Sequence, residues 1–524
     1  RILYTPVVTG SGLVPPAISE EPGHRFAAEG TVDRFRPVAA TRNEGARAMR
    51  FHPSPRGSAP ATAFVLTVAV ALSLLSGGCV STPTARNQRL HHFEPTRGYR
   101  LSNVGPNATN TDSIVVVLTF SGGGTRAAAL AYGVLEVLRD TPIAWEGAER
   151  TLLDEVDVIS SVSGGSLPAA YYGLFGDRIF EDFPEEVLYK NIQGSLIKQL
   201  LFPRTNFELF SPFYTRTDIM ARRFGREFFG EKTFGDLSAA GRRPFIVINA
   251  TDIASGTRFE FTQDQFDHLY SDLNSFPIGY AVAASAAFPG AFPPLTLRNY
   301  ERGADYALPA WEKEILSAED PDHWTYDYAR SLQTYDKAGR RFIHLTDGGV
   351  ADNLGLLPVI QVLRQSIGSH PGLPAGRFTG VKKVLIVTVN AETSVDRGWD
   401  ARQSPLGLIA TLLAAGTTPL SNFTRAQVEY IRLLLRNYEL QGLLDFGGTD
   451  ANGQKPAGPE CRFVEVSFAG IDDPAERDVL DNLPTSFKLE REEVDLLRAA
   501  AAKILAGHPD FQGFIAGLQP GVTR

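Results

Sequence analysis

The residues best suited to chemistry lie in "DVISSVSGGSLPAAYYG", where four serines crowd a run of small residues. A serine hydroxyl attacks a carbonyl carbon once a nearby base takes its proton. The segment passes from an apolar stretch through a turn into a helix-like stretch, the layout of a nucleophile elbow. Such an elbow needs small residues two positions before and two after the nucleophile, and Ser161 and Gly165 provide them around Ser163. The spacing therefore predicts Ser163 as the attacking residue, with Ser161 replacing the first glycine of G-x-S-x-G. A turn without catalytic function is the alternative.

A glycine-rich loop precedes this segment by one strand–helix unit. The β-branched run "SIVVVLTF" predicts a buried parallel strand, and "SGGGTRAAALAYGVLEVLRD" continues it with a turn and a helix. The loop lacks the Gly-Lys-Ser/Thr of a P-loop and the G-x-G-x-x-G of a dinucleotide site. Backbone N–H groups of Gly122, Gly123 and Gly124 at a helix N-terminus could instead bind a developing oxyanion. Arg126 could steady this loop, meet a substrate phosphate or form a surface ion pair.

A carboxylate follows a third apolar run, in "RFIHLTDGGVADNLG". Asp347, followed by Gly348 and Gly349, could be a simple turn. It could also present its carboxylate at the carboxyl end of a parallel sheet, where ligands of such folds collect. A serine–histidine–aspartate triad is the competing arrangement, and the histidines considered for it are His344, His370 and His508.

Together these motifs resemble those of the patatin-like phospholipases, whose distant relatives include the cytosolic phospholipase A2 catalytic domain. The matching stretches occur in the family's order: "SGGGTRA", "SVSGG", "NATDIASGTRFEF", "AVAASAAFPGAFPPL", "DGGVADNLG" and "NLPTSFKLEREEVDLL". The resemblance implies a three-layer αβα domain with a mainly parallel central sheet. It implies Ser163 as nucleophile, Asp347 as its only partner and Gly122–Gly124 as oxyanion loop, with Arg126, Gly165, Gly348 and Gly349 in support. No cofactor is implied.

Composition narrows the classes of partner. The 524-residue chain has a formal net charge of −8 and no basic stripe, which argues against nucleic-acid binding. Two cysteines are too few for a disulfide framework, and no His/Cys cluster has zinc-ligand spacing. No acidic loop indicates a calcium requirement.

The N-terminal part predicts a membrane anchor. Translation is expected to begin at Met49, so that residues 1–48 are upstream sequence, or else a disordered extension. Residues 49–78 have the basic start and the apolar run of a signal peptide and end in "LSGG" before Cys79. This resembles a bacterial lipobox, with Cys79 as the lipidated residue and Val80 favouring the outer membrane. A plain cleaved signal and an uncleaved anchor are the alternatives. We therefore expect a lipid-anchored protein of the bacterial cell envelope, on the outer rather than the inner membrane.

The composition of the chain after Cys79 divides it into further segments. Residues 79–112 are polar and rich in Pro, Gly and Asn, which predicts a linker or a surface arm, and residues 113–524 are expected to form the hydrolase domain. Residues 300–340 look like an insertion, and residues 404–440 form either core helices or a lipid-facing cap. Asn249 and Asp252 could support the site or only shape turns.

The expected function is hydrolysis of acyl esters in phospholipids or lysophospholipids. The alternatives are an esterase for soluble esters and a lipid-binding protein without turnover. The expected partners are the lipid substrate and the membrane, and no protein partner is assigned.

Overall fold

The computed structural model describes residues 86–106, 109–194, 214–318, 325–367, 381–393, 407–441 and 459–518. These residues belong to one compact unit, Ser81–Arg524. The expected segments 1–48 and 49–78, together with Cys79, lie outside the described residues. Among the described residues, no helix is both long and apolar enough to cross a membrane.

An eight-stranded sheet forms the centre of the unit. Its order is β12 (Glu460–Ser467), β11 (Lys383–Asn390), β2 (Ile114–Phe120), β5 (Val156–Val162), β6 (Phe245–Asp252), β10 (Phe342–Asp347) and β9 (Leu295–Arg298), with β7 (Thr257–Glu260) also paired to β6. The pairs from β12 to β6 are all parallel. The nearly continuous apolar runs of β2 and β11 fit strands that are buried on both faces.

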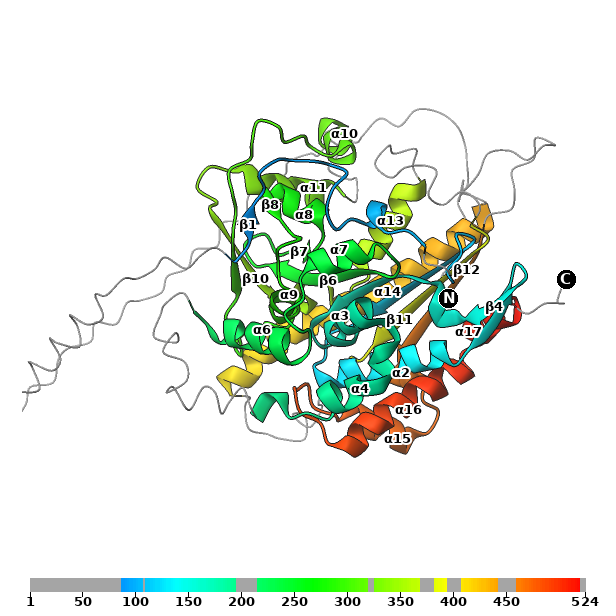
Figure 1. Ribbon diagram of the computed structural model, residues 1–524. Coiled ribbons are helices and arrows are strands. Elements are labelled where there is room, and N and C mark those ends of the chain that lie inside the picture. Colours follow the sequence, from blue (N-terminus) through cyan, green and yellow to red (C-terminus); the bar gives the residue numbers. More distant parts are fainter. Residues whose placement is uncertain are drawn as a thin grey trace, which may run out of the picture. The chain divides into compact units, whose positions relative to one another are not determined.

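Helices cover both faces of this sheet, which gives the predicted three layers. Alternate residues of β2 and β11 enter two separate hydrophobic clusters, because side chains alternate between the faces of a strand. One cluster includes side chains of α2 (Thr125–Arg139), α3 (Ser166–Phe175), α9 (Ile278–Ser285) and α16 (Arg491–Gly507). The other includes α13 (Leu357–Ile367) and α14 (Leu408–Gln441), and Figure 1 shows α14 passing behind the strands. The expected mainly parallel αβα fold is confirmed.

The strand that carries Asp347 runs in the direction opposite to the one we expected. β10 pairs antiparallel with β6, and Asp347 faces Ala250. Val162, the last residue of β5, faces Asn249, which is the residue before Ala250. β10 therefore ends where β5 ends, approaching from beyond the carboxyl edge of the parallel strands. A single sequence carries no signal for this direction, since it depends on long-range pairing.

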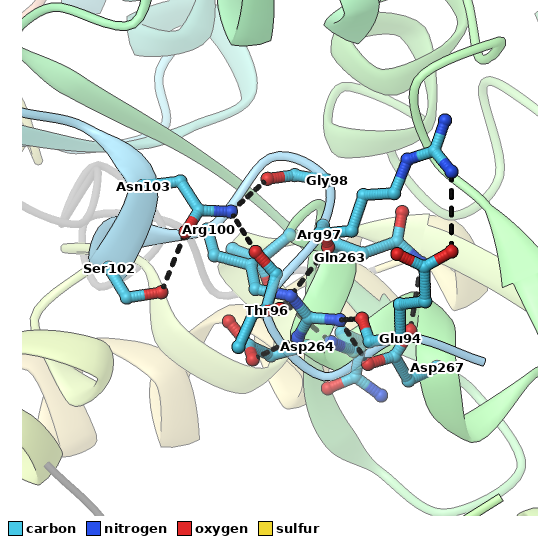
Figure 2. Close-up of polar contacts among 12 residues, drawn as sticks. Glu94, Thr96, Arg97, Gly98, Arg100, Ser102, Asn103, Gln263, Asp264 and Asp267 are labelled. Carbon is cyan, nitrogen blue, oxygen red and sulfur yellow. Dashed lines mark hydrogen bonds and ion pairs between the residues drawn. The ribbon is translucent and has the colours of Figure 1, made fainter.

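The segment expected to be a linker is instead packed against the domain where the structure describes it. β1 (Gln88–Arg89) pairs with β8 (Ser271–Asp272), and the buried Tyr99 hydroxyl accepts a hydrogen bond from Ile246 N. Arg100 is 3% exposed and forms ion pairs with Asp264 and Asp267 of α8 (Gln263–His268). Figure 2 shows both pairs. Polar and Gly/Pro-rich composition misled the prediction because a buried ion pair can fix such a segment without apolar residues.

The insertion at residues 300–340 and the candidate cap region at residues 404–440 both contribute helices that pack onto the domain. Residues 300–340 include α10 (Ala310–Ala318) and α11 (Tyr326–Gln333), which lie next to each other. Arg340 pairs with the fully buried Asp252, so Asp252 ties the insertion to β6. The candidate cap region is one helix, α14, which continues through Pro419. Val428, Ile431 and Leu435 of α14 pack into the core, so this half of the helix follows the core interpretation.

The described residues also form shorter strands, turns and helices around the central sheet. These are η1 (Leu101–Asn103), β3 (Pro142–Trp145), β4 (Ala148–Thr151), η2 (Leu152–Glu155), η3 (Ser163–Gly165), η4 (Gly176–Arg178), α4 (Ile179–Phe183), η5 (Pro184–Leu188), α6 (Arg216–Glu227), α7 (Phe234–Ala240), η8 (Thr334–Asp336), α12 (Gly349–Asp352), η10 (Phe468–Gly470), α15 (Pro474–Asp481) and α17 (Pro509–Ala516).

Candidate active site

Ser163 lies at the turn between β5 and α3, as expected for a nucleophile elbow. Its φ is +49°, a left-handed conformation that non-glycine residues rarely adopt. Such local strain is typical of functional sites. Ser161 stays on β5 and donates its hydroxyl to Val247 O at 3.1 Å, so this position needs a small residue but no left-handed backbone.

Ser163 and Asp347 form a hydrogen-bonded pair. Ser163 Oγ donates to Asp347 Oδ2 over 2.8 Å, and both residues are buried. The other carboxylate oxygen accepts from Gly349 N at 2.8 Å. Burial raises the pKa of Asp347 to about 6, against the opposing effect of these two hydrogen bonds. A carboxylate with that pKa is ionised near neutral pH yet basic enough to take a proton from a serine.

Ser285, at the end of α9, holds the backbone of the elbow, and sequence analysis did not identify it. Its hydroxyl accepts a hydrogen bond from Ser163 N at 2.8 Å and donates to Asn249 O at 2.6 Å. The next turn holds the aspartate, since Ala287 O accepts from Asp347 N at 3.0 Å. The only signal in the sequence was a polar residue within the small-residue stretch "AVAASAAFPG".

Asn249 supports the same elbow from β6. Its side-chain nitrogen donates to Ser160 Oγ at 2.9 Å and to Ser161 O at 3.0 Å. Of the two roles considered for Asn249, the structure favours support of the site. Asp252, three residues further along β6, follows the turn interpretation, because it accepts hydrogen bonds from Ala254 N at 3.2 Å and Ser255 Oγ at 3.0 Å, and it also holds the insertion through Arg340.

The glycine loop touches the elbow, and it offers fewer free donors than expected. A Cβ on Gly164 would lie 2.0 Å from Gly124 O, so loop and elbow are in direct contact. Gly122 N donates to Asn353 O at 3.0 Å and therefore has no hydrogen left for an oxyanion. Gly123 N and Gly124 N donate no hydrogen bond to the part of the chain that the structure describes. The loop thus retains two amides for this role, beside the N-terminus of α2.

Arg126 holds the loop from behind and is not part of a surface ion pair. It is 3% exposed and donates to Ala391 O at 2.8 Å, Leu483 O at 2.6 Å and Thr485 Oγ1 at 2.9 Å. Burial lowers its pKa to about 10. With its guanidinium bonded to the scaffold, Arg126 is suited to steadying the loop rather than to meeting a substrate phosphate.

The other predicted glycines allow close approach of backbone segments. A Cβ on Gly165 would lie 2.7 Å from Ser121 O, and one on Gly348 would lie 2.3 Å from Asn249 O. Gly349 would approach Asp347 Oδ1 to 3.1 Å. These glycines let β2, β6 and β10 meet at the elbow, which explains why small residues cluster there.

None of the histidines in the described part of the chain lies at the Ser163–Asp347 pair. His344 is exposed on β10 and lies 3.0 Å from Thr296 Oγ1, and His508 precedes α17. His370 lies outside the described residues. No described histidine hydrogen-bonds to Ser163 or Asp347. Nor do three or more His, Cys, Asp or Glu side chains gather as a possible metal site in the described part of the chain.

Comparison with solved structures returns distant similarities. Human GIVD cytosolic phospholipase A2 is 14% identical with a TM-score of 0.42, and the match covers 78% of this chain and 60% of the human one. This chain therefore spans less than two thirds of that protein. VipD from Legionella pneumophila is 11% identical with a TM-score of 0.25, over 82% of this chain and 73% of VipD. No curated protein matches this chain.

A family comparison identifies a domain within the chain. The sequence model of the patatin-like phospholipases matches residues 118–360. This range includes the glycine loop, Ser163, Ser285 and Asp347, whereas the segment 482–497 that contacts the loop lies beyond it. Residues 118–360 of this chain thus form a patatin-like phospholipase domain.

Proposed function

We propose that the protein hydrolyses acyl esters of phospholipids or lysophospholipids through a Ser163–Asp347 dyad. The observation that carries this proposal is the 2.8 Å hydrogen bond between the Ser163 hydroxyl, on its left-handed turn, and the buried Asp347. Nucleophile and base in direct contact are the minimum that covalent ester hydrolysis needs.

The proposed reaction has two steps. Asp347 takes the Ser163 proton as Oγ attacks the ester carbonyl, and the negative oxygen is stabilised by the amides of Gly123 and Gly124. Collapse of this intermediate releases the alcohol part of the lipid, which takes the proton back from Asp347, and leaves an acyl-serine. Asp347 then takes a proton from water as the water oxygen attacks the acyl-serine. Collapse of this second intermediate releases the fatty acid and returns the proton from Asp347 to Ser163 Oγ. Throughout, Asp347 is the only proton carrier.

The test measures fatty acid release from phospholipid vesicles and from a short soluble ester. We expect Ser163→Ala to reduce turnover about 10⁴-fold or more. Asp347→Asn should cost about 10²–10⁴-fold, the usual contribution of a general base. Ser161→Ala is the matched control, because it removes a buried serine two residues away and should change turnover only a few-fold.

Each other outcome points to a different function. Turnover that survives Ser163→Ala would overturn the dyad. Cleavage of the soluble ester alone would favour a plain esterase. No turnover of either ester by the folded parent would favour a lipid-binding protein.

We further propose that Cys79 is lipidated and holds the enzyme on a bacterial membrane, the outer membrane in preference to the inner. The support is the sequence "LSGGC" after a basic and apolar leader. Two or more acyl chains give stable anchoring, whereas one gives only reversible binding. Cys79→Ser should move the protein from the membrane fraction to the soluble fraction while ester turnover by the purified protein persists. An unchanged membrane fraction would argue for an uncleaved anchor.

A further inference from the structure

A cavity of about 420 Å³ lies on the face of the sheet that α13 covers. Its floor is made of apolar side chains from β2, β5, β6 and β11, among them Val115 and Val247. Residues of α13 form one wall, and Trp311 and Leu332 of α10 and α11 belong to another. Neither Ser163 nor Asp347 is among the described residues that line it, so this cavity is distinct from the dyad.

The size of the cavity fits one lipid chain. Ligand sites usually measure about 300–1,000 Å³ and are mostly apolar with a few polar groups. A methylene group needs about as much room as a water molecule in the liquid, about 30 Å³. The cavity therefore has room for about 14 such groups in all, which fits a medium-length acyl chain together with a small head group. Two chains of a phospholipid would not fit.

The charged side chains of the lining already pair with each other or with neighbours. Arg243 contacts Asp112 and Asp157, each at 2.8 Å. His268 contacts Glu312 at 2.9 Å. Of the remaining acidic residues that line the cavity, Glu260 pairs with an arginine at 2.7 Å and Asp264 pairs with Arg100.

A carboxylate or phosphate in this cavity would therefore compete with existing acidic partners for Arg243 and His268. Burying such an unpaired anion is costly, which favours an uncharged head group.

Among the described residues of the lining, two uncharged side chains have a buried polar atom without a hydrogen-bond partner, Gln265 (Nε2) and Gln361 (Oε1). Gln265 lines the cavity and is 3% exposed, and its Nε2 donates no hydrogen bond to a described residue. A hydroxyl or ester oxygen of a ligand would satisfy this amide. Arg100 pairs with Asp264, which lines the cavity next to Gln265 in the chain. Figure 2 shows Asp264 and a second lining residue, Ser102, in the surroundings of Arg100.

We propose that this cavity binds a neutral single-chain lipid of the monoacylglycerol class, at a site separate from the catalytic serine. Ser160, three residues before Ser163 on the chain, is also among the residues that line this cavity. The proposal concerns binding only and does not depend on the roles of Ser163 and Asp347.

The test uses tryptophan fluorescence of the full chain carrying Ser163→Ala, so that a bound ester is not hydrolysed. The probe is a monoacylglycerol with bromine atoms at mid-chain, because bromine quenches tryptophans that it contacts. Trp311 is one of four tryptophans and lines the cavity. We expect saturable quenching, most of which disappears in Trp311→Phe.

Two further variants locate the ligand. Val115→Phe fills part of the cavity and should weaken binding about tenfold, since each lost methylene contact costs about 0.8 kcal/mol and about 1.4 kcal/mol is a factor of ten. Val479→Phe makes the same change on the exposed face of α15 and should leave binding unchanged. Gln265→Leu should weaken binding of the probe without filling the cavity.

Two results would overturn the proposal. One is quenching that Trp311→Phe and Val115→Phe both leave intact, which would locate the lipid elsewhere, for example at the catalytic serine. The other is equal affinity for the brominated fatty acid in its ionised form, which would contradict the preference for a neutral head group. A Val115→Phe variant that fails to fold leaves Trp311→Phe and Gln265→Leu to decide.

Discussion

At the scale of single residues, the site depends on one strained serine and one buried aspartate. The left-handed backbone of Ser163 costs roughly 1–3 kcal/mol unless its surroundings fix it. The bond from Ser163 N to Ser285 Oγ is one contact that does so. Burial of Asp347 raises the pKa of its carboxyl group and so makes the carboxylate a stronger base. The backbone conformation of Ser163 and the basicity of Asp347 thus both depend on the residues that surround them.

The raised pKa of Asp347 predicts the pH dependence of turnover. In the proposed mechanism only the ionised carboxylate can accept the serine proton, and the pKa of Asp347 is about 6. kcat/KM should therefore rise as pH increases and reach half its plateau near pH 6. The measurement is a pH profile with a soluble ester, and the residual activity of Asp347→Asn should lack this transition. A profile that falls as pH increases through this range would assign the base to another group.

Ser285 is predicted to be a positioning residue. Ser285→Ala leaves the Ser163 amide without its buried acceptor, a loss of about 1–3 kcal/mol. Because the elbow holds the nucleophile and not the lipid, kcat should fall about tenfold or more while KM changes little. Ser285→Thr should restore part of kcat.

The matched control for this prediction is Ser166→Ala. It removes a hydroxyl that lies 3.2 Å from Ser285 Oγ but leaves the bond to Ser163 N. We expect it to retain most of kcat. If Ser285→Ala acted only on the fold, the melting temperature would fall, but kcat would not decrease selectively while KM stays nearly constant.

At the scale of elements, the elbow requires strands and helices to approach each other without side chains between them. β2 passes so close to the turn before α3 that a Cβ on Gly165 would lie 2.7 Å from both Phe120 Cβ and Ser121 O. The backbone of Gly165 is itself helical, with φ −64°, so its conformation suits any residue. Steric contact alone therefore demands a glycine at this position.

Gly165→Ala is expected to destabilise the protein by about 1–3 kcal/mol, the usual cost of overpacking. It should also reduce turnover, because the elbow must shift away from β2. The control is Gly513→Ala in α17, where a Cβ would meet nothing within 4 Å. That substitution should be neutral or stabilise by up to about 1 kcal/mol. Urea unfolding of both variants gives the comparison, and equal stability of the two would contradict the steric argument.

At the scale of the whole molecule, several buried carboxylates hold protons more tightly in the fold than in the unfolded chain. Burial raises the pKa of Asp157 to about 7, and the pKa values of Asp267 and Asp347 to about 6. Between about pH 4 and pH 7 the folded protein therefore binds more protons at these groups than the unfolded chain does. Protonation of these groups therefore increases the free energy of unfolding at the acidic end of this range, and this stabilisation is lost as pH rises through their folded pKa values.

The expected outcome is a higher melting temperature near pH 5.5 than near pH 7.5. Asp157→Asn should flatten this slope, because it removes the group with the highest of these pKa values. Thermal unfolding in buffers across the range is the measurement. A melting temperature that climbs steadily toward alkaline pH would show that other groups dominate the linkage.

The sequence by itself predicted the central strands, the elbow and an aspartate at a strand end from local signals, whereas the pairing of Ser163 with Asp347 was expected from the family resemblance. A continuous β-branched run, a turn of small residues and an aspartate after an apolar strand are visible within a few residues of each other. The tertiary structure alone decided the antiparallel direction of β10, the pairing of Gly122 N with Asn353 O and the contact of Ser285 with Ser163 N. It also decided that residues 86–106, which looked like a linker, are fixed by the buried Arg100. These features arise from contacts between residues far apart in the chain, and the energy of such a contact depends on burial and geometry that a single sequence does not contain.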